Sequence, residues 1–249
     1  MAAIKTRGLV IRERAYSEQD KILTLFTEKE GKIQAIAKGA RRRKSTIGAA
    51  TQLFTYCEFV YWPGKNLATI NQAEVIESYY KLSSNLYKMA LASYGVELLD
   101  AFYELYQGDV QVLKMVSYIL YYLSEDKAKV PEALILSLQL KLCYLNGIAP
   151  AFFLKSNASI PTYIFEMGEE TGNNHHYVYQ LTVEDYTMIQ ETMKAPINSI
   201  RIKNYPLAEV EKISSMINHY IGYSLDRRMK AWEFYKEIGE TNENRKLSD

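Results

Sequence analysis

Cysteine and histidine are scarce in this sequence, and their scarcity excludes several classes of protein. The chain has 249 residues, with two cysteines and three histidines. Cys57 and Cys143 are 86 positions apart and neither stands in a Cys-x-x-Cys pair, so a cysteine-based zinc site and a disulfide framework are both excluded. We therefore expect a chain that works in the reducing cytoplasm.

Long apolar runs are missing as well. The most apolar stretch, residues 133–154, is interrupted by Lys141, Gly147 and Pro150, whereas a membrane-spanning helix needs about 20 predominantly apolar residues. The N-terminus turns charged at Lys5 before an apolar segment can form, which argues against a signal peptide. The sequence thus predicts no membrane segment.

Charge is balanced over the whole chain but not along it. The formal net charge is +1, and 48% of the residues are hydrophobic and 24% charged, as in ordinary globular proteins. Residues 1–80 carry 13 Lys and Arg against 8 Asp and Glu, a net +5, whereas residues 81–249 carry 17 against 21, a net −4. This asymmetry indicates that the first part meets a polyanion and that the rest does something else.

The apolar pattern of the first 80 residues is typical of short strands separated by turns. It predicts strands within residues 8–11, 21–27, 31–38, 54–62 and 67–76. Five short strands in succession predict a small barrel of the OB type.

Helical periodicity replaces the strand pattern after residue 82. We expect one helix capped by Ser84 and ending near Gly108, and a second over residues 112–123. A third helix should have Pro131 in its first turn and Gly147 just past its end.

The C-terminal third is less regular. Short strands are expected near Tyr163 and Tyr177, a helix capped by Thr182 with Asp185 three residues on, and another helix from Pro206. The predicted fold class is therefore α+β, an N-terminal OB-fold β-barrel followed by a mainly α-helical domain. The expected domains are residues 1–80, residues 81–240 with an irregular insert at about 149–181, and a flexible tail at 241–249.

The most distinctive motif is a cationic loop directly after the third predicted strand. Residues 38–45 read Lys-Gly-Ala-Arg-Arg-Arg-Lys-Ser and place five cations within seven positions. Cations packed this densely repel one another unless phosphates neutralise them, so the loop favours nucleic-acid binding over a merely solvated surface. The candidate DNA-binding residues are these five cations and others in the same barrel, namely Lys38, Arg41, Arg42, Arg43, Lys44, Arg7, Arg12, Arg14 and Lys32.

Aromatic residues on the predicted strand 54–62 extend this pattern. Tyr56, Phe59, Tyr61 and Trp62 lie on it, and aromatic platforms beside a basic groove hold single-stranded nucleic acid by base stacking, at about 1–3 kcal/mol per base. Alternating aromatic residues in a strand also pack in cores, so whether they face DNA or the core stays open.

Groups suited to catalysis or to metal binding are few. Glu18 and Asp20 could hold a metal for phosphoryl chemistry, but two acids before a strand more often cap a turn. His175 and His176 are neighbours, which rarely ligate one metal together, and His219 on a helical pattern is best interpreted as structural. We expect neither an enzyme nor a metal or cofactor site.

Several segments together resemble the RecO family of bacterial DNA-repair proteins. They are Gly8-x-Val10, Glu18-x-Asp20-Lys21, Leu25-Phe26-Thr27, Gly31-Lys32, Ala37-Lys38-Gly39-Ala40-Arg41, Ser45, Gln72-Ala73-Glu74, Tyr94-x-x-Glu97-Leu98 and Leu145-x-Gly147-x-x-Pro150. The likeness in order and spacing covers residues 5–150, and residues 150–249 resemble the family only weakly.

The resemblance implies a non-catalytic recombination mediator with an OB fold and a helical bundle, located in the bacterial cytoplasm at the nucleoid. It implies binding of single- and double-stranded DNA, annealing of complementary strands, and contacts with RecR and single-stranded-DNA-binding protein so that RecA can load. It also places the cationic loop in the family's DNA-binding domain. Many members carry four zinc-ligating cysteines after the Gly-x-x-Pro segment, whereas residues 151–176 contain none, so we expect packing to hold this segment.

Two further hypotheses belong to other classes. One is a protein-docking adaptor whose basic loop binds an acidic partner rather than DNA. The other is a metal nuclease that uses Glu18 and Asp20 and would cut DNA only with a divalent cation.

Overall fold

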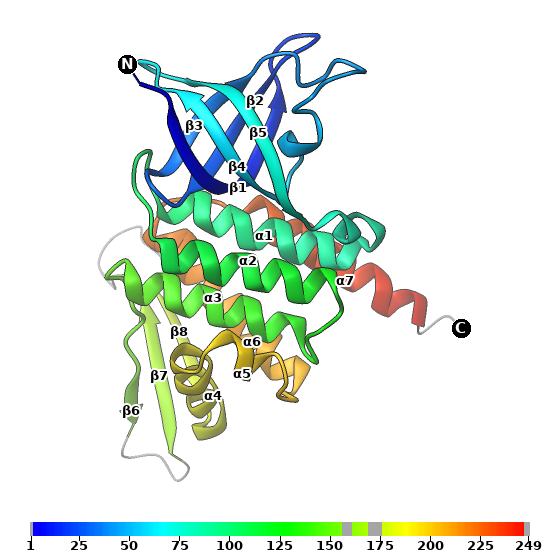
Figure 1. The fold of residues 1–249 in the computed structure, drawn as a ribbon. Coiled ribbons are helices and arrows are strands. Elements are labelled where there is room, and N and C mark those ends of the chain that lie inside the picture. The colour runs from blue at the N-terminus through cyan, green and yellow to red at the C-terminus, as the bar shows by residue number, and fades with distance from the viewer. Residues whose placement is uncertain (1, 156–160, 169–175, 247–249) are drawn as a thin grey trace. The chain divides into compact units, whose positions relative to one another are not determined.

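The computed structural model describes residues 2–155, 161–168 and 176–246 (Figure 1). Contacts divide the chain into two compact units: unit 1 is Met1–Asp126 with Lys230–Asp249, and unit 2 is Lys127–Met229. A domain boundary near residue 80 differs from this division, because unit 1 contains helices as well as the barrel. Whether residues 1–80 fold on their own stays a prediction.

Unit 1 begins with a closed five-stranded barrel (Figure 1). Its strands are β1 (Ile4–Ala15), β2 (Lys21–Thr27), β3 (Gly31–Ala37), β4 (Thr55–Trp62) and β5 (Ala68–Ser78). The order around the barrel is β1-β2-β3-β5-β4, and β3 pairs with β5 in parallel while the other pairs are antiparallel. The predicted OB-type barrel is thus confirmed, with each predicted strand overlapping an observed one.

Alternation along the strands builds the barrel core. The buried residues that pack together there include Val10, Leu23, Leu25, Ile33, Ala35, Ala37, Cys57, Phe59, Tyr61, Ala68 and Ile70. The connection from β3 to β4 contains the short 3-10 helix η1 (Ala49–Thr51), and Ala40, Ile47 and Ala50 from this connection pack against the same core. Apolar side chains therefore fix the connection that carries the cationic motif.

Helix α1 (Leu86–Phe102) starts one residue later than predicted. Asn85, rather than Ser84, caps it, because Asn85 has an extended backbone and its side chain accepts a hydrogen bond from the Lys88 amide at 3.0 Å. Ser84 instead ends the 3-10 helix η2 (Tyr80–Ser84), where its hydroxyl donates to the Lys81 carbonyl at 2.7 Å.

Helix α1 also ends before the predicted limit at Gly108. The residues after Phe102 run beside the start of β3, where the Lys32 amide donates to the Gln107 carbonyl at 2.8 Å and the Tyr106 amide donates to the Lys32 carbonyl at 2.7 Å. These backbone bonds take the place of further helical turns. The next helix, α2 (Val110–Ser124), agrees with the prediction for residues 112–123.

Helix α7 (Lys230–Lys246) extends into the region predicted as a flexible tail, residues 241–249. It packs on α1 through aromatic rings: Trp232 lies 5.0 Å from Tyr94, and Tyr235 lies 5.3 Å from Tyr87, between ring centroids. Tertiary packing stabilises helices that local sequence does not indicate. Of the predicted tail, residues 247–249 lie outside the described residues.

Unit 2 confirms most of its predicted signals. Its elements are α3 (Pro131–Leu145), β6 (Phe153–Lys155), β7 (Thr162–Met167), β8 (Tyr177–Leu181), α4 (Val183–Lys194), α5 (Ile197–Ile200) and α6 (Leu207–Ser224). Pro131 is in the first turn of α3, and Gly147 follows that helix with φ +75°. Thr182 and Asp185 form the predicted capping box of α4.

Aromatic rings pack together beside the three-stranded sheet of unit 2. The three-stranded sheet has the order β6-β7-β8. The ring of Tyr163 on β7 stacks on the ring of Tyr186 on α4, with ring centroids 3.8 Å apart. The ring centroid of Phe165 lies 5.5 Å from that of Phe152 and 5.2 Å from that of Tyr220. Residues 156–160 and 169–175 lie outside the described residues, so the expectation that packing holds residues 151–176 stays a prediction. No helix of the described residues has both the length and the hydropathy needed to cross a membrane.

Candidate nucleic-acid interface

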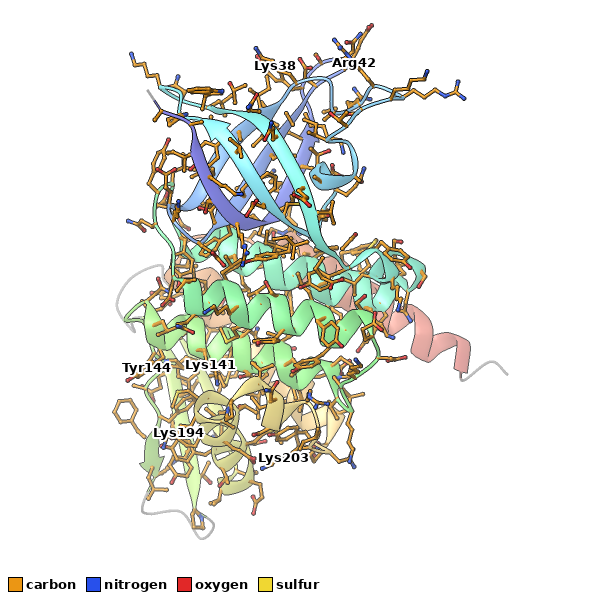
Figure 2. All side chains as sticks on the ribbon, in the orientation of Figure 1. Lys38, Arg42, Lys141, Tyr144, Lys194 and Lys203 are labelled. Atoms are coloured by element: carbon orange, nitrogen blue, oxygen red, sulfur yellow. The ribbon has the colours of Figure 1, made fainter. Side chains whose placement is uncertain are left out.

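The cationic motif lies on the connection that leaves β3, and we call residues 38–48 the cationic loop. Figure 2 shows Lys38 and Arg42 at the end of the barrel from which this loop extends. All five of its cations are exposed: Lys38, Arg41, Arg42, Arg43 and Lys44. The structure therefore places five of the nine sequence candidates together on one loop.

The loop between β1 and β2, residues 16–20, holds the cationic loop in place. Its Gln19 carbonyl accepts the Arg41 amide at 2.9 Å, and the Ser17 carbonyl accepts the Arg41 guanidinium (Nη1) at 2.6 Å. The Gln19 side chain accepts Arg42 Nε at 2.6 Å. Two arginines are thus positioned by neutral oxygens, and Arg42 also interacts electrostatically with the carboxylate of Asp20.

Asp20 anchors the same junction with a carboxylate. Its Oδ1 accepts the Gly39 amide at 2.8 Å, and this hydrogen bond is the main cause that lowers the pKa of Asp20. The role is that of a turn acid, as the sequence favours, while Glu18 is exposed. Within the described residues no cluster of three His, Cys, Asp or Glu side chains is positioned to hold a metal ion.

The two loops enclose an open cleft of about 620 Å³. It is lined by residues 17–20 on one side and by Lys38, Gly39 and Arg42 on the other. A polar cleft with cations on its rim is suited to a charged backbone rather than to an apolar ligand.

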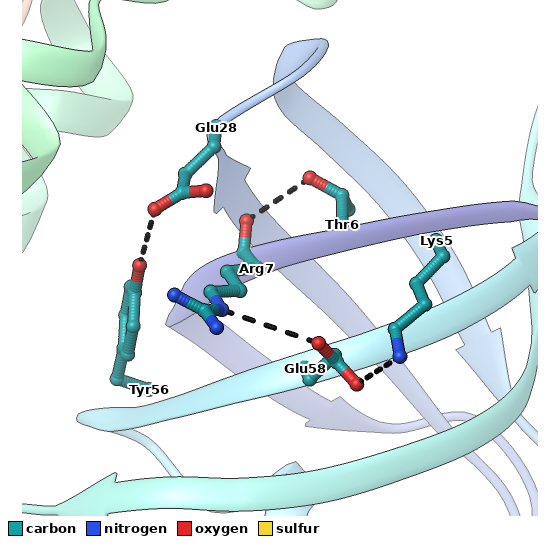
Figure 3. Close-up of polar contacts among 6 residues, drawn as sticks. All are labelled: Lys5, Thr6, Arg7, Glu28, Tyr56 and Glu58. Carbon is teal, nitrogen blue, oxygen red and sulfur yellow. Dashed lines mark hydrogen bonds and ion pairs between the residues drawn. The ribbon is translucent and has the colours of Figure 1, made fainter.

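Ion pairing distinguishes the cationic loop from the other cations of the barrel. Lys5 and Arg7 both pair with Glu58, at 2.5 Å and 4.0 Å (Figure 3), and Lys21 pairs with Glu13. In the described part of the chain, no carboxylate lies within 4.0 Å of the side-chain nitrogens of the cationic loop. Part of the positive charge of the barrel is therefore compensated by ion pairs, whereas the cationic loop has only the longer-range electrostatic interaction of Asp20 with Arg42 and Lys38.

Lys32 and Arg7 do not join the loop, although the sequence grouped them with it. The side chain of Lys32 is buried, donating to the Asp100 carbonyl at 2.8 Å and pairing with its carboxylate at 3.3 Å. It stands near the start of β3, about 20 Å along the strand from Lys38. Arg7 lies in the first half of β1, opposite Glu58 of β4. We leave both out of the candidate interface.

Arg12 and Arg14 stay in the candidate interface. Both are exposed on the second half of β1, which pairs with β2 and leads into the loop at residues 16–20. Arg14 lies opposite Ile22, and Ile22 lies opposite Ile36, two residues before Lys38. The register therefore puts Arg14 on the same face of the sheet as Ile22 and as Ile36, which lies on the strand that leads to the cationic loop.

Base stacking by the aromatic residues of β4 requires exposed rings, and most of the rings on this strand are not exposed. Phe59 and Tyr61 belong to the barrel core, and burial raises the pKa of Tyr61. Tyr56 donates its hydroxyl to Glu28 at 2.8 Å (Figure 3). Only Trp62 of this group is exposed, at 46%.

An aromatic residue that the sequence analysis missed stands beside the cationic loop. Tyr16 follows the last residue of β1 and is 62% exposed. The signal that could have found it is its position directly before Ser17, in the turn that also contains Asp20.

Helical residues cover the outer face of the barrel at its other end. Phe26 of β2 is buried and contacts Tyr103 edge-on, with ring centroids 5.1 Å apart, and Lys32 reaches Asp100 of α1. Since the strands 2 and 3 of OB folds are a common ligand face, this cover directs the candidate interface to the loop end of the barrel.

The histidines are engaged in local contacts. His176 lies 3.7 Å from Glu166, between Nε2 and Oε2, and His219 Nδ1 lies 2.6 Å from the hydroxyl of Tyr179. The latter contact fits the structural role expected of His219. His175 lies outside the described residues.

A closed barrel of this topology, with exposed cations on the loop after its third strand, defines an OB-fold protein with a basic surface loop. The chain belongs to the RecO family of DNA repair and recombination proteins. The family models described as "Recombination protein O N terminal" and "Recombination protein O C terminal" match residues 1–79 and 83–233.

Curated relatives named DNA repair protein RecO align with nearly the whole chain. The protein of Alkaliphilus metalliredigens is 30% identical over 235 residues, which cover 92% of each chain. That of Caldicellulosiruptor saccharolyticus is 32% identical over 248 residues, covering 96% of this chain and 100% of its own. That of Clostridium novyi is 29% identical over 256 residues and covers 98% of each.

Proposed function

We propose that this chain is a non-enzymatic recombination mediator that acts on the DNA of the bacterial cytoplasm. It binds single- and double-stranded DNA through the cationic loop together with Arg12 and Arg14, and it anneals complementary strands. With RecR and single-stranded-DNA-binding protein, it helps RecA to load. Membership of the RecO family supports the biological role, and the charge distribution of the barrel supports the binding step.

The observation that carries the proposal is the contrast in ion pairing. Four cations of the barrel, Lys5, Arg7, Lys21 and Lys32, have a carboxylate within 4.0 Å. Among the described residues the five cations of the loop are exposed and have no carboxylate at this distance, and Asp20 interacts with Arg42 and Lys38 only at longer range. A protein that needed this loop only for solubility would gain nothing from crowding like charges. Phosphates release condensed counterions when they meet such a loop, which makes association favourable.

Annealing follows from the same charge density. Two complementary strands repel each other over about 10 Å at 0.1 M ionic strength. A loop with several free cations neutralises phosphates of both strands locally, which lowers the repulsion while the bases pair. Residues 81–249, with a net charge of −4, are better suited to protein partners than to phosphates.

The test is a strand-annealing assay with a loop variant and a charge-matched control. Replacing Arg41, Arg42, Arg43 and Lys44 with alanine removes four free cations. We expect this variant to lose most annealing of complementary oligonucleotides and to bind single-stranded DNA at least tenfold more weakly at 0.1 M salt.

The control variant replaces Lys29, Lys114, Lys129 and Lys194, four exposed lysines outside the cationic loop. It has the same net charge as the loop variant and should anneal like the wild type. Equal losses of annealing and of DNA binding in both variants would mean that the net charge, and not the position of the cations, causes these losses. Tight capture of an acidic protein by the wild type, without DNA affinity at physiological salt, would favour the adaptor hypothesis.

A further inference from the structure

Tyr16 is an exposed aromatic residue beside the cationic loop. Among the described residues of the barrel, Tyr16 and Trp62 are the aromatic side chains that are largely exposed, at 62% and 46%. Single exposed apolar residues are common on protein surfaces and need no explanation by themselves. The position of Tyr16 is informative because its neighbours are the residues that hold two arginines.

The turn that carries Tyr16 is well ordered by hydrogen bonds. The Tyr16 amide donates to the Asp20 carbonyl at 3.0 Å, and the Ser17 hydroxyl accepts the Asp20 amide at 3.1 Å. Asp20 in turn accepts the Gly39 amide at 2.8 Å. The backbone of Tyr16 is therefore fixed relative to the start of the cationic loop.

The two arginine side chains are held by residues that closely follow Tyr16 in the sequence. The carbonyl of Ser17, the next residue, accepts the Arg41 guanidinium at 2.6 Å, and the Gln19 side chain accepts Arg42 Nε at 2.6 Å. The ring of Tyr16 itself makes no hydrogen bond, ring contact or ion pair with any described residue. An exposed aromatic side chain on a fixed backbone thus directly precedes the turn that holds two arginines.

We propose that Tyr16 stacks on an unpaired base of single-stranded DNA whose phosphates are held by Arg41 and Arg42. This inference rests on the proposed DNA-binding function and adds the form of DNA that the junction selects. Every base has a π-face, so stacking is independent of sequence. In a duplex these faces are already stacked on one another, and duplex DNA gains only the phosphate contacts. Tyr16 therefore confers a preference for single strands.

The experiment compares Tyr16→Leu and Tyr16→Phe with the wild type in anisotropy titrations of a labelled oligo(dT) and of a blunt duplex. Loss of the ring should weaken binding of oligo(dT) by about 5- to 150-fold, the equivalent of one stacked base. Duplex binding should change less than about twofold, and the salt dependence should stay that of the wild type, because no phosphate contact is removed. Tyr16→Phe keeps the ring and should bind like the wild type.

The matched control is Tyr80→Leu, since Tyr80 is 71% exposed but lies in η2, outside the loop junction. It should leave both DNA affinities unchanged. Photo-crosslinking with oligo(dT) that contains 5-iodouracil, followed by mass spectrometry, should identify Tyr16 as a crosslinked residue in the wild type.

The outcomes separate this inference from the function on which it rests. If the four-alanine loop variant loses oligo(dT) binding while Tyr16→Leu binds like the wild type, stacking by Tyr16 is wrong and the proposed function stands. If Tyr16→Leu weakens single-strand and duplex binding equally, the selectivity is wrong. If the wild type binds neither DNA, both proposals fail.

Discussion

Asp20 places a negative charge within a surface proposed to bind a polyanion. Water and salt screen the repulsion between an exposed carboxylate and a phosphate. Asp20 uses its charge to fix the Gly39 amide at 2.8 Å, and a hydrogen bond to an ionised acceptor is stronger than one between neutral groups. We therefore expect the anchoring effect to outweigh the repulsion.

The prediction at this scale compares two substitutions of Asp20. Asp20→Asn removes the charge but keeps an oxygen acceptor for Gly39, so single-stranded DNA affinity should equal or exceed that of the wild type. Asp20→Ala removes the acceptor as well, and we expect its affinity to be about three- to tenfold lower than that of Asp20→Asn because the cationic loop is less ordered. Anisotropy titrations at one salt concentration measure both.

The pH dependence of this anchor has a definite sign. The hydrogen bond from the Gly39 amide lowers the folded-state pKa of Asp20 below its ordinary value of 3.8, so the stabilising effect of Asp20 is complete above that value and is lost as pH falls through the folded pKa. DNA binding between pH 6 and 8 should thus be insensitive to Asp20 titration.

The comparison of the two Asp20 substitutions also has an outcome that would contradict the anchoring role. That outcome is tighter DNA binding by Asp20→Ala than by Asp20→Asn.

Residue partners are the part of the site that the sequence alone could not supply. The cationic motif is contiguous, so its five cations were found from the sequence. The ion pair of Lys32 with Asp100 joins residues 68 positions apart, and no local pattern indicates it. Tyr16 was missed for a related reason: its significance depends on Ser17 meeting Arg41, 24 positions away.

At the scale of elements, a carboxylate of α1 caps the start of α7. Glu97 Oε1 accepts the Lys230 amide at 3.0 Å, and its Oε2 accepts the Ala231 amide at 2.8 Å. The first amides of a helix have no partner within it, and a negative charge there also interacts favourably with the helix dipole. Glu97 therefore joins two helices of unit 1 that are distant in sequence.

Removal of this cap should destabilise the protein measurably. Glu97→Ala should lower the free energy of unfolding of unit 1 by about 1–2 kcal/mol, and Glu97→Gln, which keeps one acceptor oxygen, by less. Chemical denaturation followed by tryptophan fluorescence reports the change, since Trp232 lies in α7. Glu104→Ala, at an exposed site after α1, is the control, and equal stability of Glu97→Ala and the wild type would refute the capping role.

Local sequence signals predicted most helices and strands, and the remaining elements depend on packing against segments distant in the sequence. The barrel strands and α3 follow from periodicity and from residues such as Pro131 and Gly147, which act on their own neighbourhood. Helix α7 has a polar sequence, and its rings at Trp232 and Tyr235 gain their partners from α1. Such a helix cannot be inferred until the segment it packs against is known.

At the scale of the whole molecule, charge is segregated along the chain and then partly neutralised within the barrel. Residues 1–80 carry a net +5, but ion pairs compensate Lys5, Lys21 and Lys32. The free positive charge is thereby concentrated on the cationic loop and its neighbours on β1. The overall net charge of +1 conceals this concentration.

The most direct test of this account is the salt dependence of single-stranded DNA binding. Affinities of the wild type and of the variant with Arg41, Arg42, Arg43 and Lys44 replaced by alanine are measured at several salt concentrations. Each phosphate contact contributes about −0.7 to the slope of log affinity against log salt concentration. We predict a steep slope for the wild type and, for the variant, a slope flatter by up to about 3. Identical slopes for the two proteins would contradict the assignment of the cationic loop as the DNA-binding surface.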